Sequence, residues 1–246
     1  MSRKVLITGA AGRIGSFITA QWIDRYDLHL TDIRSPDKTF DLPFTTADLS
    51  DFDAVLSLCE DMDTIVHLGA DPSMEATWES LLPNNVIATY NVFEAAKQAG
   101  CRRVIFASSV NAVFGYPRDV QVHIDMPVRP PNLYGASKAW GEAVAAYYGT
   151  QTDLSAICLR FGWVVDRNSP AIKFDHPYID ITLTYEDLAR LVTGAIDASD
   201  EITYKVFHGV SNNRWKRLDI SDARAILGYE PQDDGFELAR QNQVSN

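Results

Sequence analysis

Short, continuous runs of apolar residues alternate along the first two-thirds of the chain with stretches in which apolar residues recur every three or four positions. The continuous runs are typical of buried parallel strands, and they cover residues 5–8, 28–31, 64–68, 104–107 and 154–159. The periodic stretches predict helices, and they cover residues 13–25, 51–59, 78–99 and 133–148. Regular alternation of strand and helix predicts an α/β fold, a Rossmann-type doubly wound parallel sheet.

The last third of the chain has a weaker pattern, and residues 166–180 show no regular period. A helix is expected over residues 185–196, because Thr184 and Asp187 have a spacing that resembles a capping box. The remaining predicted elements are a strand near 204–208 and a short helix near 219–227. Since no linker separates these elements from the rest, we expect a single domain whose last part forms a small lobe on the same sheet.

The charge balance limits the partners of this chain. Its 246 residues include 22 Lys and Arg against 33 Asp and Glu, a net charge of −11. Nucleic acid and anionic membranes bind basic surfaces, so neither is expected as a partner. No apolar run approaches the about 18 residues of a membrane span, and the apolar stretch near the start is too short for a signal peptide. Three scattered cysteines, Cys59, Cys101 and Cys158, are typical of reduced thiols and predict a cytoplasmic protein.

A glycine pattern, TGAAGRIG at residues 8–15, follows the first predicted strand and opens the first predicted helix. Glycines in this context permit a tight turn and a close approach of the backbone to a pyrophosphate at the helix N-terminus. The alternative is a glycine-rich turn without a ligand. We expect a dinucleotide to be bound here by Gly9, Gly12, Arg13, Ile14 and Gly15.

Asp32 ends the second predicted strand, 17 residues after Gly15. A carboxylate at this position accepts hydrogen bonds from the ribose hydroxyls of NAD and repels the extra phosphate of NADP. Arg13 and Arg34 lie close enough in the sequence to soften that repulsion, and a solvated loop acid is the alternative interpretation. We therefore expect NAD as the cofactor, with NADP the less favoured choice.

Further cofactor contacts are expected after the third and fourth strands. Asp48 and Leu49 follow the third strand, where a carboxylate can lie beside the adenine amino group. Asp48 can equally be the N-cap of the helix that begins near Asp51. Leu68, Gly69 and Ala70 end the fourth strand with mostly small residues, as expected where the backbone passes close to the cofactor.

Tyr134 and Lys138 lie one turn apart on the predicted helix 133–148. A free tyrosine has a pKa of about 10, but the Lys138 ammonium and a positive nicotinamide ring would lower that pKa and make the phenol a general base. Lys138 can also bind the nicotinamide ribose. The alternative is that Tyr134 and Lys138 form an ordinary pair on the protein surface. Ser109 ends the fifth strand, where its hydroxyl can hold a substrate oxygen or simply cap a turn. The histidines are too scattered to predict a metal site.

These motifs resemble the extended short-chain dehydrogenase/reductase proteins, the NAD-dependent epimerase/dehydratase family. The resemblance covers residues 4–165 firmly and the remainder loosely, and its matching stretches are TGAAGRIG, HLGA, NNVIATYNVFEAA, VIFASS and YGASKAWGE. It implies a dinucleotide-binding core over residues 1–165 and a small substrate-binding portion over residues 166–246. It also implies a homodimer or larger homo-oligomer, built through the helices at 78–99 and 133–148.

Within this family the chain is similar to the uronate dehydrogenases and the related archaeal glucose-6-phosphate dehydrogenases. The short chain, the segment SSVNAVFGYP and the tail SNNRWKRLD carry that likeness. It implies that Ser109, Tyr134 and Lys138 are catalytic. It further implies that Ser73 and Asn111 contact the substrate, with Ser109, and that Asn85 supports the backbone behind the cofactor or packs a helix.

Two positions depart from the pattern of the uronate dehydrogenases. Pro177 stands where an arginine that binds the substrate carboxylate is expected, and Lys173 or His176 would have to supply the positive charge instead. Counting back from Gly115 places Val110 in the position of the catalytic serine. The separation of 25 residues from Tyr134 favours Ser109, which we therefore expect to be the catalytic hydroxyl.

Together these features predict an NAD-dependent oxidoreductase that oxidises the C1 hydroxyl of a free sugar or a uronate-like sugar acid to a lactone, with Tyr134 as the base. A nucleotide-sugar epimerase or dehydratase is the first alternative, which the short C-terminal portion disfavours. A non-catalytic NAD-sensing protein is the second. The presence of both Tyr134 and Lys138 disfavours it.

Overall fold

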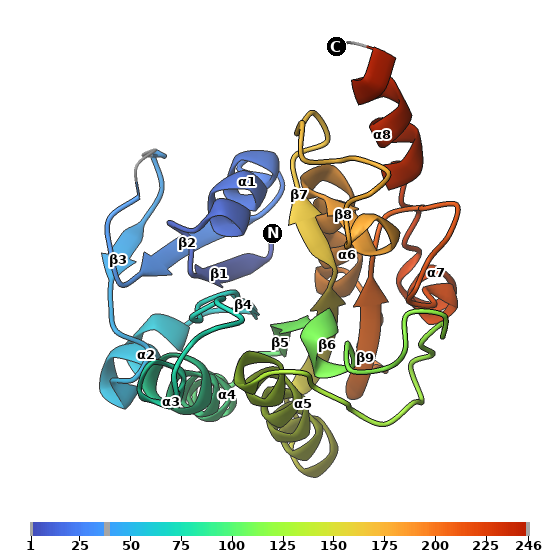
Figure 1. The fold of residues 1–246 in the computed structure, drawn as a ribbon. Helices are drawn as coiled ribbons and strands as arrows, with labels where there is room; N and C mark the ends of the chain where they lie inside the picture. The colour runs from blue at the N-terminus through green and yellow to red at the C-terminus, as the bar shows by residue number, and fades with distance from the viewer. Residues whose placement is uncertain (1, 37–39, 245–246) are drawn as a thin grey trace.

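The computed structural model describes residues 2–36 and 40–244. A parallel sheet of seven strands in the order β3-β2-β1-β4-β5-β6-β9 forms its centre (Figure 1). This order confirms the predicted doubly wound fold, because the chain builds outward from β1 in one direction and then from β4 in the other. The strands are β1 (Lys4–Thr8), β2 (Asp27–Asp32), β3 (Phe44–Thr46), β4 (Thr64–His67), β5 (Arg103–Ser109), β6 (Ser155–Phe161) and β9 (Tyr204–Gly209).

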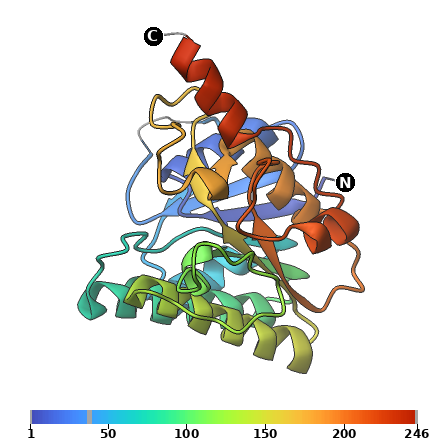
Figure 2. The ribbon, with the colours of Figure 1, turned by 45° about the vertical axis from the view of Figure 1, so that its right-hand side comes forward.

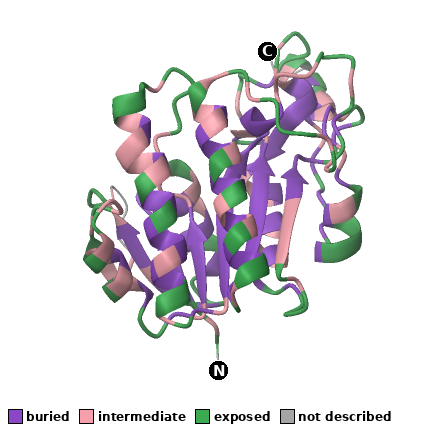
Figure 3. Ribbon diagram, turned by 90° about the horizontal axis from the view of Figure 1, so that it is seen from below, coloured by how far each residue is buried: buried purple, intermediate pink, exposed green. Residues whose placement is uncertain are grey.

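Helices cover both faces of the sheet, as Figure 1 and Figure 3 show. One face carries α1 (Arg13–Trp22) and α6 (Tyr185–Ile196), which are joined by a hydrogen bond of 3.0 Å from Trp22 Nε1 to Thr193 Oγ1. The other face carries α2 (Phe52–Cys59), α4 (Ala88–Gln98) and α5 (Leu133–Gln151). Each face buries its own apolar cluster, with Ile18 and Leu188 in the first and Phe93 and Ala145 in the second.

The C-terminal portion extends the sheet and adds small elements beside it. These elements are β7 (Trp163–Val165), β8 (Thr182–Thr184), α7 (Ser221–Leu227) and α8 (Gly235–Val244). Strands β7 and β8 form a separate parallel pair, which the sequence pattern did not predict. Helix α8 was not predicted either; it packs on residues 165–179 through Leu238 and Ala239 and projects beyond the sheet in Figures 1 and 2. No helix in the described ranges has the length and apolar character needed to cross a membrane.

The predicted helix 78–99 is a composite of three segments. It consists of α3 (Trp78–Leu81), a π-helical segment (Leu82–Ile87) and α4. Pro83 lies in the first turn of the π-helical segment, where its missing N–H leaves a gap in the α-helical hydrogen bonds. The wider turn carries Asn85, which is buried and accepts a hydrogen bond from the backbone N–H of Asp71.

The predicted capping box at α6 is only half present. Thr184 is the N-cap and accepts a hydrogen bond from the Asp187 backbone N–H. The Asp187 carboxylate does not reach back to Thr184. It accepts hydrogen bonds from the backbone N–H groups of Gln232 and Asp233 at 2.8 and 3.0 Å, and so fastens the C-terminal segment to α6.

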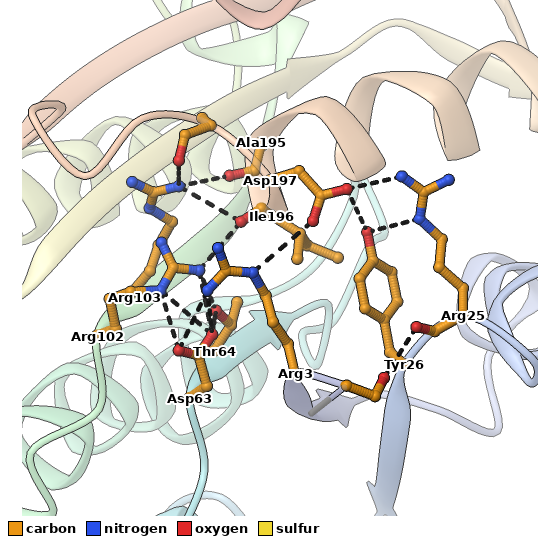
Figure 4. Close-up of polar contacts among 12 residues, drawn as sticks. Arg3, Arg25, Tyr26, Asp63, Thr64, Arg102, Arg103, Ala195, Ile196 and Asp197 are labelled. Atoms are coloured by element: carbon orange, nitrogen blue, oxygen red, sulfur yellow. Dashed lines mark hydrogen bonds and ion pairs between the residues drawn. The ribbon is translucent and has the colours of Figure 1, made fainter.

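An arginine cluster joins the amino ends of the strands to the end of α6 (Figure 4). Arg102 donates to Asp63 at 3.0 Å, and Arg25 pairs with Asp197 at 2.7 Å. Arg103 is fully buried and donates to backbone carbonyls at and just after the C-terminus of α6, including that of Ala195 at 3.0 Å. A cation at this position satisfies the last carbonyls of the helix and complements its dipole.

Candidate active site

A cavity of about 600 Å³ lies at the carboxyl ends of the strands. It spans the position between β1 and β4 where the strand order reverses, which is where open α/β sheets bind ligands. The predicted cofactor residues that line it are Gly9, Gly12, Arg13, Ile14, Gly15, Asp32, Asp48, Leu49, Leu68, Gly69 and Ala70. The predicted catalytic residues that line it are Ser109, Tyr134 and Lys138. The structure therefore brings both groups to one site.

The glycine loop has the shape that a dinucleotide needs. Gly9 has a φ of 68°, and a Cβ on it would lie 2.8 Å from the backbone nitrogen of Gly69. A Cβ on Gly15 would collide with the carbonyl oxygen of Gly9. Gly12 is the N-cap of α1 and no side chain caps that helix, so the first backbone N–H groups remain available for an anion. These residues fit the pyrophosphate of a dinucleotide.

Asp32 is fixed against the glycine loop. Its carboxylate accepts hydrogen bonds from the backbone N–H of Ala11 at 2.9 Å and of Arg34 at 3.3 Å. The structure also distinguishes between the two roles considered for Asp48, a contact to the cofactor and the N-cap of α2. Asp51, not Asp48, is the N-cap of α2, and Asp48 lines the cavity.

Tyr134 and Ser109 form a hydroxyl pair at the centre of the cavity. Asn111 donates to Ser109 Oγ from its backbone N–H at 3.1 Å and from its side-chain amide at 3.2 Å. Ser109 and Tyr134 both line the cavity, and Ser109 is near enough to Tyr134 to lower the pKa of its phenol. Val110 is buried in the apolar core instead. Of the two candidate positions, Ser109 lines the cavity and Val110 does not.

Among the groups of the chain itself, burial has the largest effect on the Tyr134 pKa, and the predicted lowering of that pKa by Lys138 and a positive nicotinamide ring stays a prediction. Burial raises the pKa of Tyr134, the hydrogen bond from Ser109 lowers it, and the negative charge of Asp71 raises it. Lys138 is itself buried, with Nζ 4.9 Å from the centre of the Phe106 ring and 5.8 Å from that of Tyr134. Burial lowers the pKa of Lys138 to about 8. The desolvation of both groups outweighs the attraction expected from their spacing.

Helix α5, which carries Tyr134 and Lys138, is anchored by a buried ion pair one turn further along. The Glu142 carboxylate is paired with Arg160 of β6 at 2.8 Å and accepts a hydrogen bond from Ser108 at 2.6 Å. Ser108 lines the cavity beside Ser109. The pair therefore fixes α5 relative to the strand ends that form the site.

Asp71 is the site residue that sequence reasoning missed, although it follows Gly69 and Ala70 directly. It lines the cavity, and its carboxylate accepts hydrogen bonds from the Ser80 hydroxyl at 2.5 Å and the Ser73 backbone N–H at 2.9 Å. Buried Asn85 holds its backbone from both sides, accepting from Asp71 N–H at 2.8 Å and donating to Asp71 O at 3.1 Å. Asn85 thus supports the loop and does not itself line the cavity.

Several other predicted residues also lie outside the cavity. Ser73 is exposed, and Asn111 is buried behind Ser109. Exposed Pro177 accepts a hydrogen bond from Arg118 through its carbonyl, and the His176 ring stacks on Trp163 at 3.8 Å. The cavity is also lined by residues that were not predicted, namely Ile33, Arg34, Ala47, Pro72, Ser80, Asn84, Ala88, Ala107, Phe161, Gly162, Val164 and Tyr185.

The chain is similar to known proteins over almost its whole length. A family model described as the NAD dependent epimerase/dehydratase family matches residues 5–173. An NAD-dependent glucose-6-phosphate dehydrogenase of Haloferax volcanii is 34% identical over 97% of this chain and 96% of the relative. A uronate dehydrogenase of Pseudomonas putida is 32% identical over 94% of this chain and 84% of the relative.

The crystal structure of uronate dehydrogenase from Agrobacterium tumefaciens has the same fold, with a TM-score of 0.87 at 29% identity over 99% of this chain and 90% of that one. These findings confirm the predicted family, its NAD cofactor and the oxidoreductase class. Sequence, fold and cavity agree that the chain belongs to the NAD-dependent epimerase/dehydratase family.

Proposed function

We propose that this protein oxidises the C1 hydroxyl of a free sugar or sugar acid to a lactone while it reduces NAD. The presence of Ser109, Tyr134 and Lys138 in one cavity with the glycine loop and Asp32 carries this proposal. The names of the relatives support it, because they include a glucose-6-phosphate dehydrogenase, uronate dehydrogenases and an L-arabinose 1-dehydrogenase.

The cofactor would be held by residues at the first three strands. The amides at the start of α1 bind its pyrophosphate, and the Asp32 carboxylate accepts hydrogen bonds from the adenosine ribose. Lys138 binds the nicotinamide ribose. NAD, when bound, supplies the acceptor for the hydride that leaves C1 of the sugar.

Two hydroxyls would handle the proton of the substrate. Ser109 donates a hydrogen bond to the C1 oxygen, and Tyr134 removes the proton from that oxygen as the C1–H bond breaks and the C1=O bond forms. The products are a lactone, NADH and a proton, so atoms and electrons balance. Desolvated Tyr134 resists ionisation, so the reaction should accelerate as the pH rises toward the pKa of this phenol.

The test is NADH formation, followed in the near ultraviolet with NAD and a panel of free aldoses, uronates and sugar phosphates. Tyr134→Phe should lower kcat by about 100-fold or more, the contribution of a positioned general base. Tyr147→Phe is the matched control, because Tyr147 is on the same helix and 59% exposed. Near-normal turnover of Tyr134→Phe would refute the mechanism. Tightly retained NAD without net NADH release would favour an epimerase.

We further propose a homodimer formed through the outer faces of α4 and α5. Tyr90, Trp140 and Tyr147 expose 48%, 37% and 59% of their surface there, and Figure 3 shows exposed positions along these helices. Large apolar side chains on neighbouring helices are typical of an interface. Sedimentation should give twice the mass of one chain, and a monomer would contradict the proposal. A cytoplasmic location of the protein stays a prediction. The three cysteines on which it depends are buried free thiols.

A further inference from the structure

Charge is distributed unevenly along the cavity. Among the described residues, its positively charged lining side chains are Arg13, Arg34 and Lys138. Arg13 and Arg34 belong to the half formed at β1 and β2, beside Asp32. Lys138 is buried next to the Tyr134 ring. The half of the cavity beyond Tyr134, where the sugar of the proposed reaction must lie, thus has no arginine, histidine or second lysine among its described lining residues.

That half of the cavity contains a carboxylate instead. Asp71 lines it, and its charge is close enough to Tyr134 to raise the pKa of the phenol. Four hydrogen bonds fix Asp71: its carboxylate accepts from Ser80 and Ser73, its backbone N–H donates to the Asn85 side chain, and its carbonyl accepts from that side chain. A carboxylate held in this way accepts hydrogen bonds from sugar hydroxyls and repels a second anion.

The side chains that could supply a compensating positive charge are engaged elsewhere. Exposed Lys173 and half-buried His176 do not line the cavity. His176 stacks on Trp163 and accepts a hydrogen bond from the Tyr178 backbone N–H at 3.2 Å. Arg118 is hydrogen-bonded to the Pro177 carbonyl at 2.9 Å. An anionic group on the substrate would therefore meet Asp71, and the one lysine that lines the cavity in the described part of the chain is Lys138, buried against the Tyr134 ring.

We infer that the substrate is an uncharged aldose, and that Asp71 selects it by accepting hydrogen bonds from its hydroxyls and by repelling uronates and sugar phosphates. This inference rests on the proposed sugar oxidation and narrows it to one substrate class. It separates this chain from the relatives that are named for a uronate or a sugar phosphate.

The experiment compares kcat/KM for D-glucose, D-glucuronate and D-glucose 6-phosphate, and for D-galactose and D-galacturonate, with NAD in excess. The wild type should prefer each neutral sugar by on the order of 100-fold, because like charges repel strongly at the effective dielectric constant of about 20 that applies near a protein surface. A higher kcat/KM for the uronate or phosphate would overturn the inference and leave the proposed oxidation standing. NAD binding without turnover of any sugar would overturn both.

The variant Asp71→Asn keeps the shape of the side chain and removes its charge. It should lower the preference for glucose over glucuronate by about tenfold or more, and it should shift the rising limb of the kcat–pH profile to lower pH, because Asp71 raises the Tyr134 pKa. Glu75→Gln is the matched control, since Glu75 is exposed on the same loop and does not line the cavity. Equal preference ratios in the two variants would overturn the role of Asp71. If Asp71→Asn does not fold, the wild-type ratios alone still decide the substrate class.

Discussion

Replacing Arg103 with methionine should destabilise the protein strongly, although Arg103 is far from the cavity. The side chain is 0% exposed. It makes four hydrogen bonds of 2.8–3.0 Å, to the Ser155 hydroxyl and to the carbonyls of Ala195, Ala198 and Ser199. Burial lowers the pKa of Arg103 only to about 10, so the guanidinium stays charged at neutral pH. Methionine fills much of the same volume and removes the donor of all four hydrogen bonds.

The expected loss follows from these contacts. Each hydrogen bond from a charged donor contributes about 1.5–3 kcal/mol, but the cost of burying the guanidinium offsets part of the sum. Removing one partner from a buried charged site typically costs about 3–5 kcal/mol, and we expect the Arg103→Met variant to lose that much. For a chain of this size the melting temperature should fall by about 10 °C.

Urea unfolding of the two proteins measures the difference directly, provided that the slope of the free energy against urea is unchanged. Arg25→Met is the matched control, because the Arg25 side chain is 54% exposed and pairs with Asp197 at the same end of the molecule. An exposed pair contributes about 1 kcal/mol at most. If both variants unfolded at the same urea concentration, the idea that Arg103 satisfies the end of α6 would be refuted.

Two further predictions concern acid stability and the glycine loop. Burial lowers the pKa of His67 to about 3 and that of His208 to about 4, so the unfolded chain takes up protons first as the pH falls below about 6.5. Between pH 7 and pH 5 the free energy of unfolding should drop by about 2 kcal/mol for each of these two histidines. A His208→Gln variant, compared by urea unfolding, should show about half of the total drop of the wild type. Gly9→Ala should weaken NAD binding by at least about tenfold, because its Cβ would strike a neighbouring backbone. Gly100→Ala, with a φ of 73° and no atom within 4 Å, should cost stability alone; equal NAD affinities in a binding titration would contradict the steric argument.

The catalytic hydroxyl shows where sequence reasoning reaches its limit. The separation from Tyr134 favoured Ser109, while the count from Gly115 favoured Val110. The packing favours Ser109, because Val110 turns into the apolar core and Ser109 lines the cavity with Tyr134. The effect of burial on the Tyr134 pKa was hidden from the sequence for a related reason. Spacing along a helix shows which side chains are neighbours, but desolvation depends on everything that packs around them.

By itself, the sequence determined the features that are local or periodic. Continuous apolar runs predicted the buried strands, and the glycine pattern at residues 8–15 predicted the loop, because both signals lie within a few neighbouring residues. Only the tertiary structure decided that Asp71 lines the same cavity as Tyr134, where Ser80 and Asn85 hold it. The tertiary structure also decided that residues 82–87 form a π-helical segment. It decided as well that His176 and Pro177 lie outside the cavity. These depend on contacts between segments far apart in the chain, and no local pattern of residues records them.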